Sequence, residues 1–131
     1  CSRRQPGEAT RALETLFDTL AVAQGALAVM SGASGVEPVT SEELAFLKAL
    51  EGRGYPVAIR THGSHLGHTV EAHFPAGVGL AALALASGRF FAPSDENGVE
   101  TPFACDDFSR VLVTGAGHWR GEGLALLERV E

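Results

Sequence analysis

The chain has 131 residues, of which 45% are apolar and 20% charged, and its formal net charge is −6. These values are typical of one globular domain that is long enough to bury its own core. The acidic excess argues against non-specific binding to nucleic acid or to an anionic membrane. The longest apolar run, residues 76–86, is too short to span a bilayer. Composition therefore predicts a soluble domain with neither kind of partner.

The two cysteines, Cys1 and Cys105, are too few for a disulfide framework in a chain of this size. We therefore expect reduced thiols and a cytoplasmic location. The basic N-terminus lacks the apolar stretch of a signal peptide. An N-terminal cysteine also occurs in processed amidohydrolases, which use their own α-amino group as a base. Such chains continue directly into a strand, whereas a helical pattern follows here.

The first half of the chain alternates between helix and strand patterns. After a loose start over residues 1–6, apolar residues recur at helical spacing from Ala9 to Leu20, which predicts an amphipathic helix. The continuous apolar run at residues 26–30 is typical of a buried strand. Small residues at positions 31–35 then permit a tight turn or the close approach of a ligand.

A second helix is predicted to begin at Thr40. Thr40 and Glu43 match a capping box, in which each side chain bonds the backbone N–H of the other residue. Leucines at helical spacing continue this helix, and two glycines end it. Residues 56–59 then predict a second buried strand.

The second half begins with four histidines in twelve residues, followed by a nearly all-apolar helix predicted over residues 69–87. Because this helix is apolar on almost every side, we expect other elements to cover most of it. A connection over residues 89–107 leads to a strand at 110–114, a turn at 115–121 and a last strand at 124–130, which predicts a hairpin.

The resulting order is helix, strand, helix, strand, helix, strand, strand. It predicts an α/β fold in which helices are layered on a mixed β-sheet. No repeat or linker divides residues 1–131, so we expect a single domain.

The histidines also raise the question of a metal site. His62, His65 and His68 are spaced by two residues each, and His73 follows closely. Zinc needs three or four nitrogen or sulfur ligands that converge on one point. This spacing does not bring three rings together in a loop, and no cysteine pair or acidic motif completes the set. We therefore expect no metal and no cofactor.

The motifs occur in an order that resembles the C-terminal half of the β-ketoacyl-acyl-carrier-protein synthases, thiolase-fold enzymes of fatty acid and polyketide synthesis. The most specific match is Gly67-His68 in SHLGHTVEAHFPAGVGLAAL, which resembles the GH motif that opens a long buried helix in the family. Residues 31–33 are similar to the HGT loop of the family, and residues 115–118 to its last glycine-rich loop. The resemblance covers nearly the whole chain and implies a thiolase-like half.

The resemblance implies a catalytic role for His68. In a decarboxylating condensation an enolate forms beside a thioester carbonyl, and an imidazole N–H that stabilises it contributes about 2.7–4 kcal/mol. A helix N-terminus would keep that imidazole neutral. The alternative is that His68 only caps the helix.

The resemblance further implies that Gly67 and the last loop contact substrate. The residues of that loop are Gly115, Ala116, Gly117 and His118.

Three positions depart from the family pattern. The first catalytic histidine of the family falls at Ser31, its lysine near Gly63, and the usual phenylalanine of the last loop at Ala116. The nucleophilic cysteine of the family belongs to the half that precedes this one, and Cys1 does not match it. Ser31 could be a nucleophile, a donor to a thioester or a turn residue.

The resemblance thus predicts the C-terminal domain of a β-ketoacyl synthase-like protein that acts on acyl thioesters bound to an acyl carrier protein. The isolated chain is expected to be inactive, because the cysteine half is missing. The alternative is a non-catalytic partner, similar to a chain-length factor, that dimerises with an active synthase. A cysteine on a strand-to-helix turn of the upstream half would favour the enzyme. A degenerate domain with an unrelated ligand is the third possibility.

Overall fold

The computed structural model describes residues 4–63, 72–92, 100–101, 108–117 and 121–130. These residues form three helices and four strands, in the order α1 (Glu8–Leu20), β1 (Leu27–Ser31), α2 (Val39–Gly52), β2 (Val57–Thr61), α4 (His73–Ser87), β3 (Arg110–Ala116) and β4 (Glu122–Glu128). The predicted α/β class and the predicted order of elements are confirmed.

The four strands form one mixed sheet with the order β2-β1-β3-β4. β1 runs parallel to both of its neighbours, and β4 pairs antiparallel with β3, so the predicted hairpin is confirmed. Parallel strands cannot be joined by a tight turn and need a long crossover. α2 lies in the crossover from β1 to β2, and α4 lies in the one from β2 to β3.

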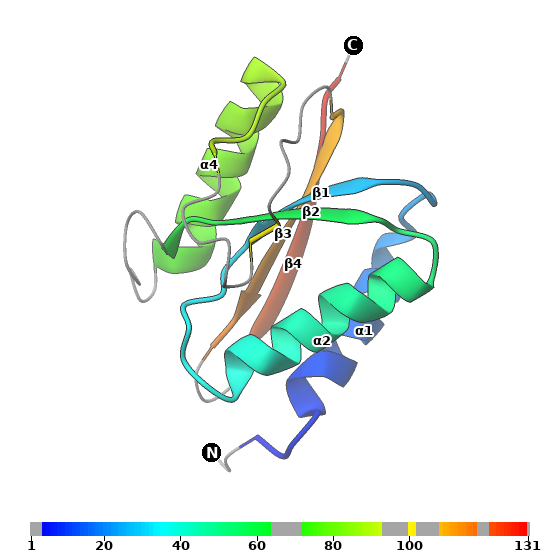
Figure 1. Ribbon diagram of the computed structural model, residues 1–131, viewed down its shortest axis with the longest axis vertical. Helices are drawn as coiled ribbons and strands as arrows, with labels where there is room; N and C mark the ends of the chain where they lie inside the picture. Colours follow the sequence, from blue (N-terminus) through cyan, green and yellow to red (C-terminus); the bar gives the residue numbers. More distant parts are fainter. Residues whose placement is uncertain (1–3, 64–71, 93–99, 102–107, 118–120, 131) are drawn as a thin grey trace.

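The helices cover both faces of the sheet, with α1 and α2 on one side and α4 on the other (Figure 1). β1 shows why both faces are apolar. Its residues Leu27 and Val29 belong to the core under α1 and α2, whereas Ala28 and Met30 belong to the core under α4. A strand that is covered on both faces has apolar residues at every position, as the continuous run at 26–30 predicted.

Aromatic rings fill the space between α1 and α2. The ring of Phe17 lies edge-on to Phe46, with centroids 6.1 Å apart, and edge-on to Tyr55, with centroids 5.1 Å apart. Tyr55 is buried, and its hydroxyl donates to the carbonyl of Val22 at 2.8 Å. This bond satisfies the one polar atom of the cluster, as buried tyrosines require.

The outer edge of β2 is covered by residues 100–101. The N–H of Thr101 donates to the carbonyl of Ile59 (3.2 Å), and the N–H of Ile59 donates to the hydroxyl of Thr101 (3.0 Å). The buried guanidinium of Arg60 donates to the carbonyls of Phe91 and Thr101, both at 2.9 Å. Arg60 therefore ties two connecting segments to this edge.

The predicted capping box is wrong. α2 begins at Val39, and Thr40 lies inside its first turn, where its hydroxyl has no hydrogen-bond partner among the described residues. The N–H of Ser41 donates instead to the carboxylate of Glu37 at 3.2 Å. Glu43 does not reach back to the start of the helix, because its carboxyl group bonds two strand residues.

The hairpin differs from the prediction: β3 begins at the predicted residue 110 but ends two residues later, and β4 begins and ends two residues earlier. Gly115 and Ala116 are not turn residues but the last two residues of β3, and β4 already begins at Glu122. A glycine suits this strand position because the ring of Phe74 occupies the space beside it. A Cβ on Gly115 would lie 2.7 Å from Cδ2 of that ring.

The described helix α4 begins at His73, and residues 69–71 of the predicted helix lie outside the described residues. The expectation that most of this helix is covered is wrong. Ala81, Ala84 and Leu85 are buried against the sheet, whereas Leu83 is 67% exposed. None of the helices in the described ranges has both the length and the apolar character to cross a membrane.

Truncating a buried leucine should cost far more stability than truncating an exposed one. Leu47 is fully buried in α2, so Leu47→Ala should lower the free energy of unfolding by about 2–5 kcal/mol. Leu83→Ala, also within a helix, should change it by less than about 0.5 kcal/mol. Denaturant unfolding of both variants measures this, and equal losses would contradict the assigned core.

Candidate functional site

The carboxyl ends of β1 and β3 meet at one edge of the sheet. The two strands are parallel neighbours, with Met30 opposite Val113. Ser31 therefore ends β1 close to the end of β3, where Gly115 and Ala116 lie. In parallel sheets this is the edge at which ligand sites are built.

Ser31 points to the same face of the sheet as Val29, because side chains alternate along a strand. It is fully buried under α2. Its hydroxyl donates to the carboxyl group of Glu43 at 3.1 Å and accepts the N–H of Ala33 at 3.1 Å. The hydroxyl thus has partners on both sides, within the protein.

Thr114 makes the matching contacts from β3. Its hydroxyl donates to the other oxygen of the Glu43 carboxyl group. It also accepts the N–H of Gly32 at 3.3 Å. One carboxyl group therefore joins the ends of two strands to the first turns of α2.

Glu43 is not among the site residues predicted from the sequence, although the sequence carries a signal for it. Glu43 precedes Leu47 by four residues and Leu50 by seven, so it lies on the apolar stripe of α2. An acidic residue on such a stripe must find buried partners. Its exposed fraction is 2%.

Burial raises the pKa of the Glu43 carboxyl group above its ordinary value, because the charged form loses its hydration. Hydrogen bonds from Thr114, from Ser31 and from the backbone of Gly32 oppose this shift. Burial is the larger effect.

Two histidines contact the same edge from the α4 side. His73, the first residue of α4, has its Nε2 atom 2.9 Å from the carbonyl oxygen of Gly32. The ring of His62, just after β2, lies against the ring of His73 with centroids 4.2 Å apart. Both rings are buried. The end of β2 is therefore connected, through His73, to the turn that follows β1.

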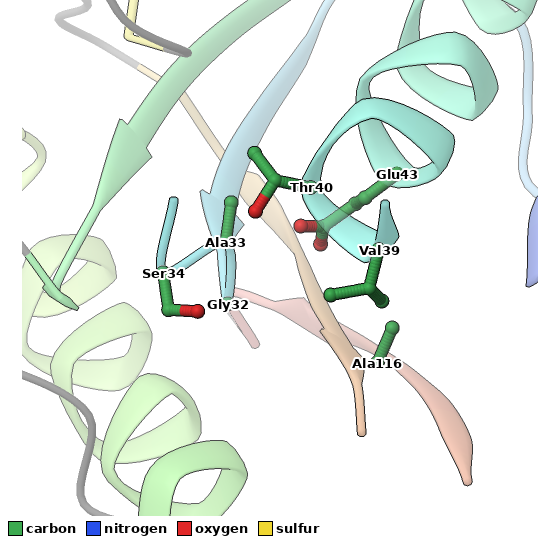
Figure 2. A pocket seen from close by; sticks show the side chains of 7 residues that line it. All are labelled: Gly32, Ala33, Ser34, Val39, Thr40, Glu43 and Ala116. Carbon is green, nitrogen blue, oxygen red and sulfur yellow. The ribbon is translucent and has the colours of Figure 1, made fainter. Parts of the chain in front are cut away.

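A small pocket opens between the start of α2 and the ends of β1 and β3. In Figure 2 the hydroxyl of Thr40 and the carboxyl group of Glu43 point toward one another at this pocket. Seven residues line it: Gly32, Ala33, Ser34, Val39, Thr40, Glu43 and Ala116. Its exposed lining is mostly polar, and the space is too small to hold a water molecule in this structure.

Other predicted site residues are placed differently or lie outside the described residues. Gly67, His68 and His118 belong to the second group. Gly117 follows β3, and its N–H donates to the carbonyl of Gly121 at 2.7 Å. Within the described part of the chain, no group of three or more metal-ligating side chains comes together.

The arrangement provides hydrogen-bond donors and acceptors and two imidazole rings at one edge of the sheet. These residue types orient polar substrates or transfer protons in other sites, and here they are buried and contact one another or the backbone. No protein-family model matches this chain, and no curated protein is similar to it in sequence.

A side chain at position 32 should not fit. A Cβ on Gly32 would lie 2.6 Å from the carbonyl oxygen of Thr114 and 3.2 Å from Cα of Gly115, both backbone atoms. Gly32→Ala should therefore lower the free energy of unfolding by about 1–3 kcal/mol. Gly52→Ala is the control, because it meets nothing within 4 Å at the end of α2, and it should raise stability by about 0.5–1 kcal/mol. Thermal or denaturant unfolding distinguishes the two, and a stable Gly32→Ala protein would disprove the close approach.

Glu43 should also make stability depend on pH. Its pKa is raised in the folded protein, so the native state holds this proton more tightly than the unfolded state does. The contribution is complete below the ordinary glutamate value of about 4.5 and is lost as the pH rises through the folded pKa. Relative to Glu43→Gln, which stays neutral, the wild type should lose stability over that window. Unfolding free energies of both proteins at pH 4, 5, 6 and 7 measure the difference, and parallel curves would contradict it.

Proposed function

We propose that this chain is the C-terminal half of a β-ketoacyl synthase-like protein that acts on acyl thioesters bound to an acyl carrier protein. The observation that carries the proposal is the meeting of three strand ends at one edge. The segments similar to the HGT loop and to the last glycine-rich loop follow β1 and end β3. The segment that leads to the GH motif follows β2, whose neighbour is β1.

The chemistry proposed for this edge is the stabilisation of an enolate. Decarboxylation of a thioester-bound extender unit places negative charge on the thioester oxygen. The imidazole N–H of His68 would donate to that oxygen, an interaction worth about 2.7–4 kcal/mol when the donor is already in place.

Ser31 cannot replace the first histidine of the family as a donor to substrate in the observed arrangement. Its hydroxyl donates to Glu43 and is fully buried. We therefore assign Ser31 to the support of the turn at residues 31–33, and leave His68 as the catalytic residue of this half.

The proposal also includes an upstream half and a dimer, and the outer face of α4 supports a covering partner. From Phe74 to Ala86 the helix has no charged residue, yet Leu83 is 67% exposed. We place the proposed covering partner on this uncharged face.

The second candidate function is a non-catalytic partner of an active synthase. It is favoured by Gly63, which stands where the family has a lysine. A Cβ at this position would lie 3.2 Å from the carbonyl oxygen of Ala33 and 3.9 Å from Cε1 of His73. Two catalytic positions of the family are thus occupied by residues without an ionisable side chain.

The polypeptide that carries this chain together with its upstream half provides the test. It is incubated with acyl-carrier and malonyl-carrier thioesters while covalent acylation is followed by intact mass and CO2 release is measured. Acylation and CO2 release support the enzyme. The absence of both, combined with a stable complex that alters the product length of an active synthase, supports the partner function. No interaction with carrier or synthase would disprove both.

His68→Ala should lower kcat for CO2 release by about 10²–10³-fold, because it removes one donor to the developing oxyanion. His65 lies in the same segment but outside the GH motif. His65→Ala should therefore leave kcat within about 2-fold of the wild type. Both rates are measured at saturating malonyl-carrier thioester. Equal losses in the two variants would show that the segment, and not the imidazole at position 68, limits the reaction.

A further inference from the structure

Glu43 is an acidic residue on the buried face of α2, at a position where an apolar side chain would be expected. The other buried residues of α2 are mostly apolar. Among the described residues, none of the groups that shift the pKa of the Glu43 carboxyl group is cationic. Burial of a carboxyl group without a countercharge is unfavourable unless hydrogen bonds compensate for it. An apolar residue here would pack at lower cost. The contacts of Glu43 must therefore explain its presence.

Those contacts form two hydrogen-bond relays to consecutive backbone amides. In the first, the N–H of Ala33 donates to Ser31 Oγ, whose hydroxyl donates to Glu43 Oε2. In the second, the N–H of Gly32 donates to Thr114 Oγ1, whose hydroxyl donates to Glu43 Oε1. A hydroxyl can accept an amide N–H while it donates its own proton. The carboxyl group therefore sets the direction of both relays.

We propose that Glu43 is a positioning residue, which orients the Ser31 and Thr114 hydroxyls and thereby holds the amides of Gly32 and Ala33 at the edge of the sheet. The inference rests on the proposed function only for the reaction that this turn serves. The positioning itself concerns four hydrogen bonds within the described residues and is tested without substrate.

Protonation of Glu43 should change the hydrogen bonds of the backbone amides in the turn at residues 31–33. When one carboxyl oxygen carries a proton, that oxygen becomes a donor, and the hydroxyl bonded to it must rotate to accept. The hydroxyl oxygen then accepts a second donor and no longer gives its proton to the carboxyl group, which weakens and reorients the hydrogen bond from the amide at the far end of that relay. Gly32 and Ala33 should respond to pH although neither titrates.

Other titratable groups lie on the elements around Glu43 and must be distinguished from it. Glu42, next on α2, accepts the N–H groups of Gly7 and Ala9. Further groups among the described residues are Glu37 at the start of α2, the Arg4–Glu122 ion pair at β4 and, on the α4 side, His73 and His62.

The test follows the backbone amide shifts of Gly32 and Ala33 in the ¹⁵N-labelled chain from pH 3.5 to 8. Both amides should titrate with one common midpoint above the ordinary glutamate value of about 4.5. In Glu43→Gln both titrations should disappear. Glu42→Gln is the matched control on the same helix. It should leave the titration of the Gly32 and Ala33 amides unchanged.

Two single-relay variants keep the inference testable if Glu43→Gln does not fold. Ser31→Ala should remove the response of Ala33 and keep that of Gly32. Thr114→Val should keep the response of Ala33 and reduce that of Gly32, whose N–H also lies against the Glu43 carboxyl group. Amides that do not titrate in the wild type would overturn the proposal. So would a titration that survives in Glu43→Gln, or one that is lost at both amides in each single-relay variant.

The proposed function and the positioning role of Glu43 are tested by different measurements, so one can fail without the other. If the protein with its upstream half does not use carrier thioesters, the amide titrations are unaffected. If it does, Glu43→Gln should shift the pH profile of kcat with less than a 2-fold change in KM. An unchanged pH profile beside a lost amide titration would show that the relays position a turn which the reaction does not use.

Discussion

β1 lies inside the sheet and runs parallel to both of its neighbours, and most of the molecule follows from that pairing. A parallel pair cannot be closed by a tight turn, so the chain must return over a face of the sheet each time. Here one return carries α2 and the other carries α4, on opposite faces (Figure 1). The carboxyl ends of three strands and the beginnings of two helices are thereby brought to a single edge.

The same strand alternation that builds the core also builds the candidate site. Val29 and Leu112 pack under α1 and α2, and the next residues on that face of their strands are Ser31 and Thr114. On each strand, a hydroxyl residue thus follows the apolar residue two positions before it on the same face. Glu43 marks the same change on α2, where it takes the place of an apolar side chain.

A buried carboxyl group bonded by neutral hydroxyls is a less stable arrangement than close apolar packing. Departures from local consistency of this kind are expected at functional sites rather than in ordinary cores. In this chain the departure coincides with the edge at which open α/β sheets bind ligands. The two observations are independent, because one comes from burial and the other from topology.

The composition of α4 does not predict which side of the helix is buried. Its nearly all-apolar sequence does not indicate which side of the helix packs on the sheet and which side faces outward. The sheet covers Ala81, Ala84 and Leu85, and Leu83 remains exposed. Only a helix with a polar face shows its outward side in the sequence.

Local periodicity determined which segments became helices and strands. The helical spacing from Ala9 to Leu20 matches α1 within one residue, and the apolar run at residues 26–30 matches β1 equally closely. These patterns are readable because each segment meets its solvent and its core at a fixed period, whatever lies opposite.

Tertiary structure alone decided what the polar side chains do. Thr40 and Glu43 match a capping box by local spacing, yet Glu43 bonds Ser31, 12 residues before it, and Thr114, 71 residues after it. A buried carboxyl group takes the strongest donors that the fold brings within reach, and sequence spacing does not state which distant donors those are. The sequence therefore determined the class and order of the elements, whereas the folded chain decided the partners of Glu43 and the exposed side of α4.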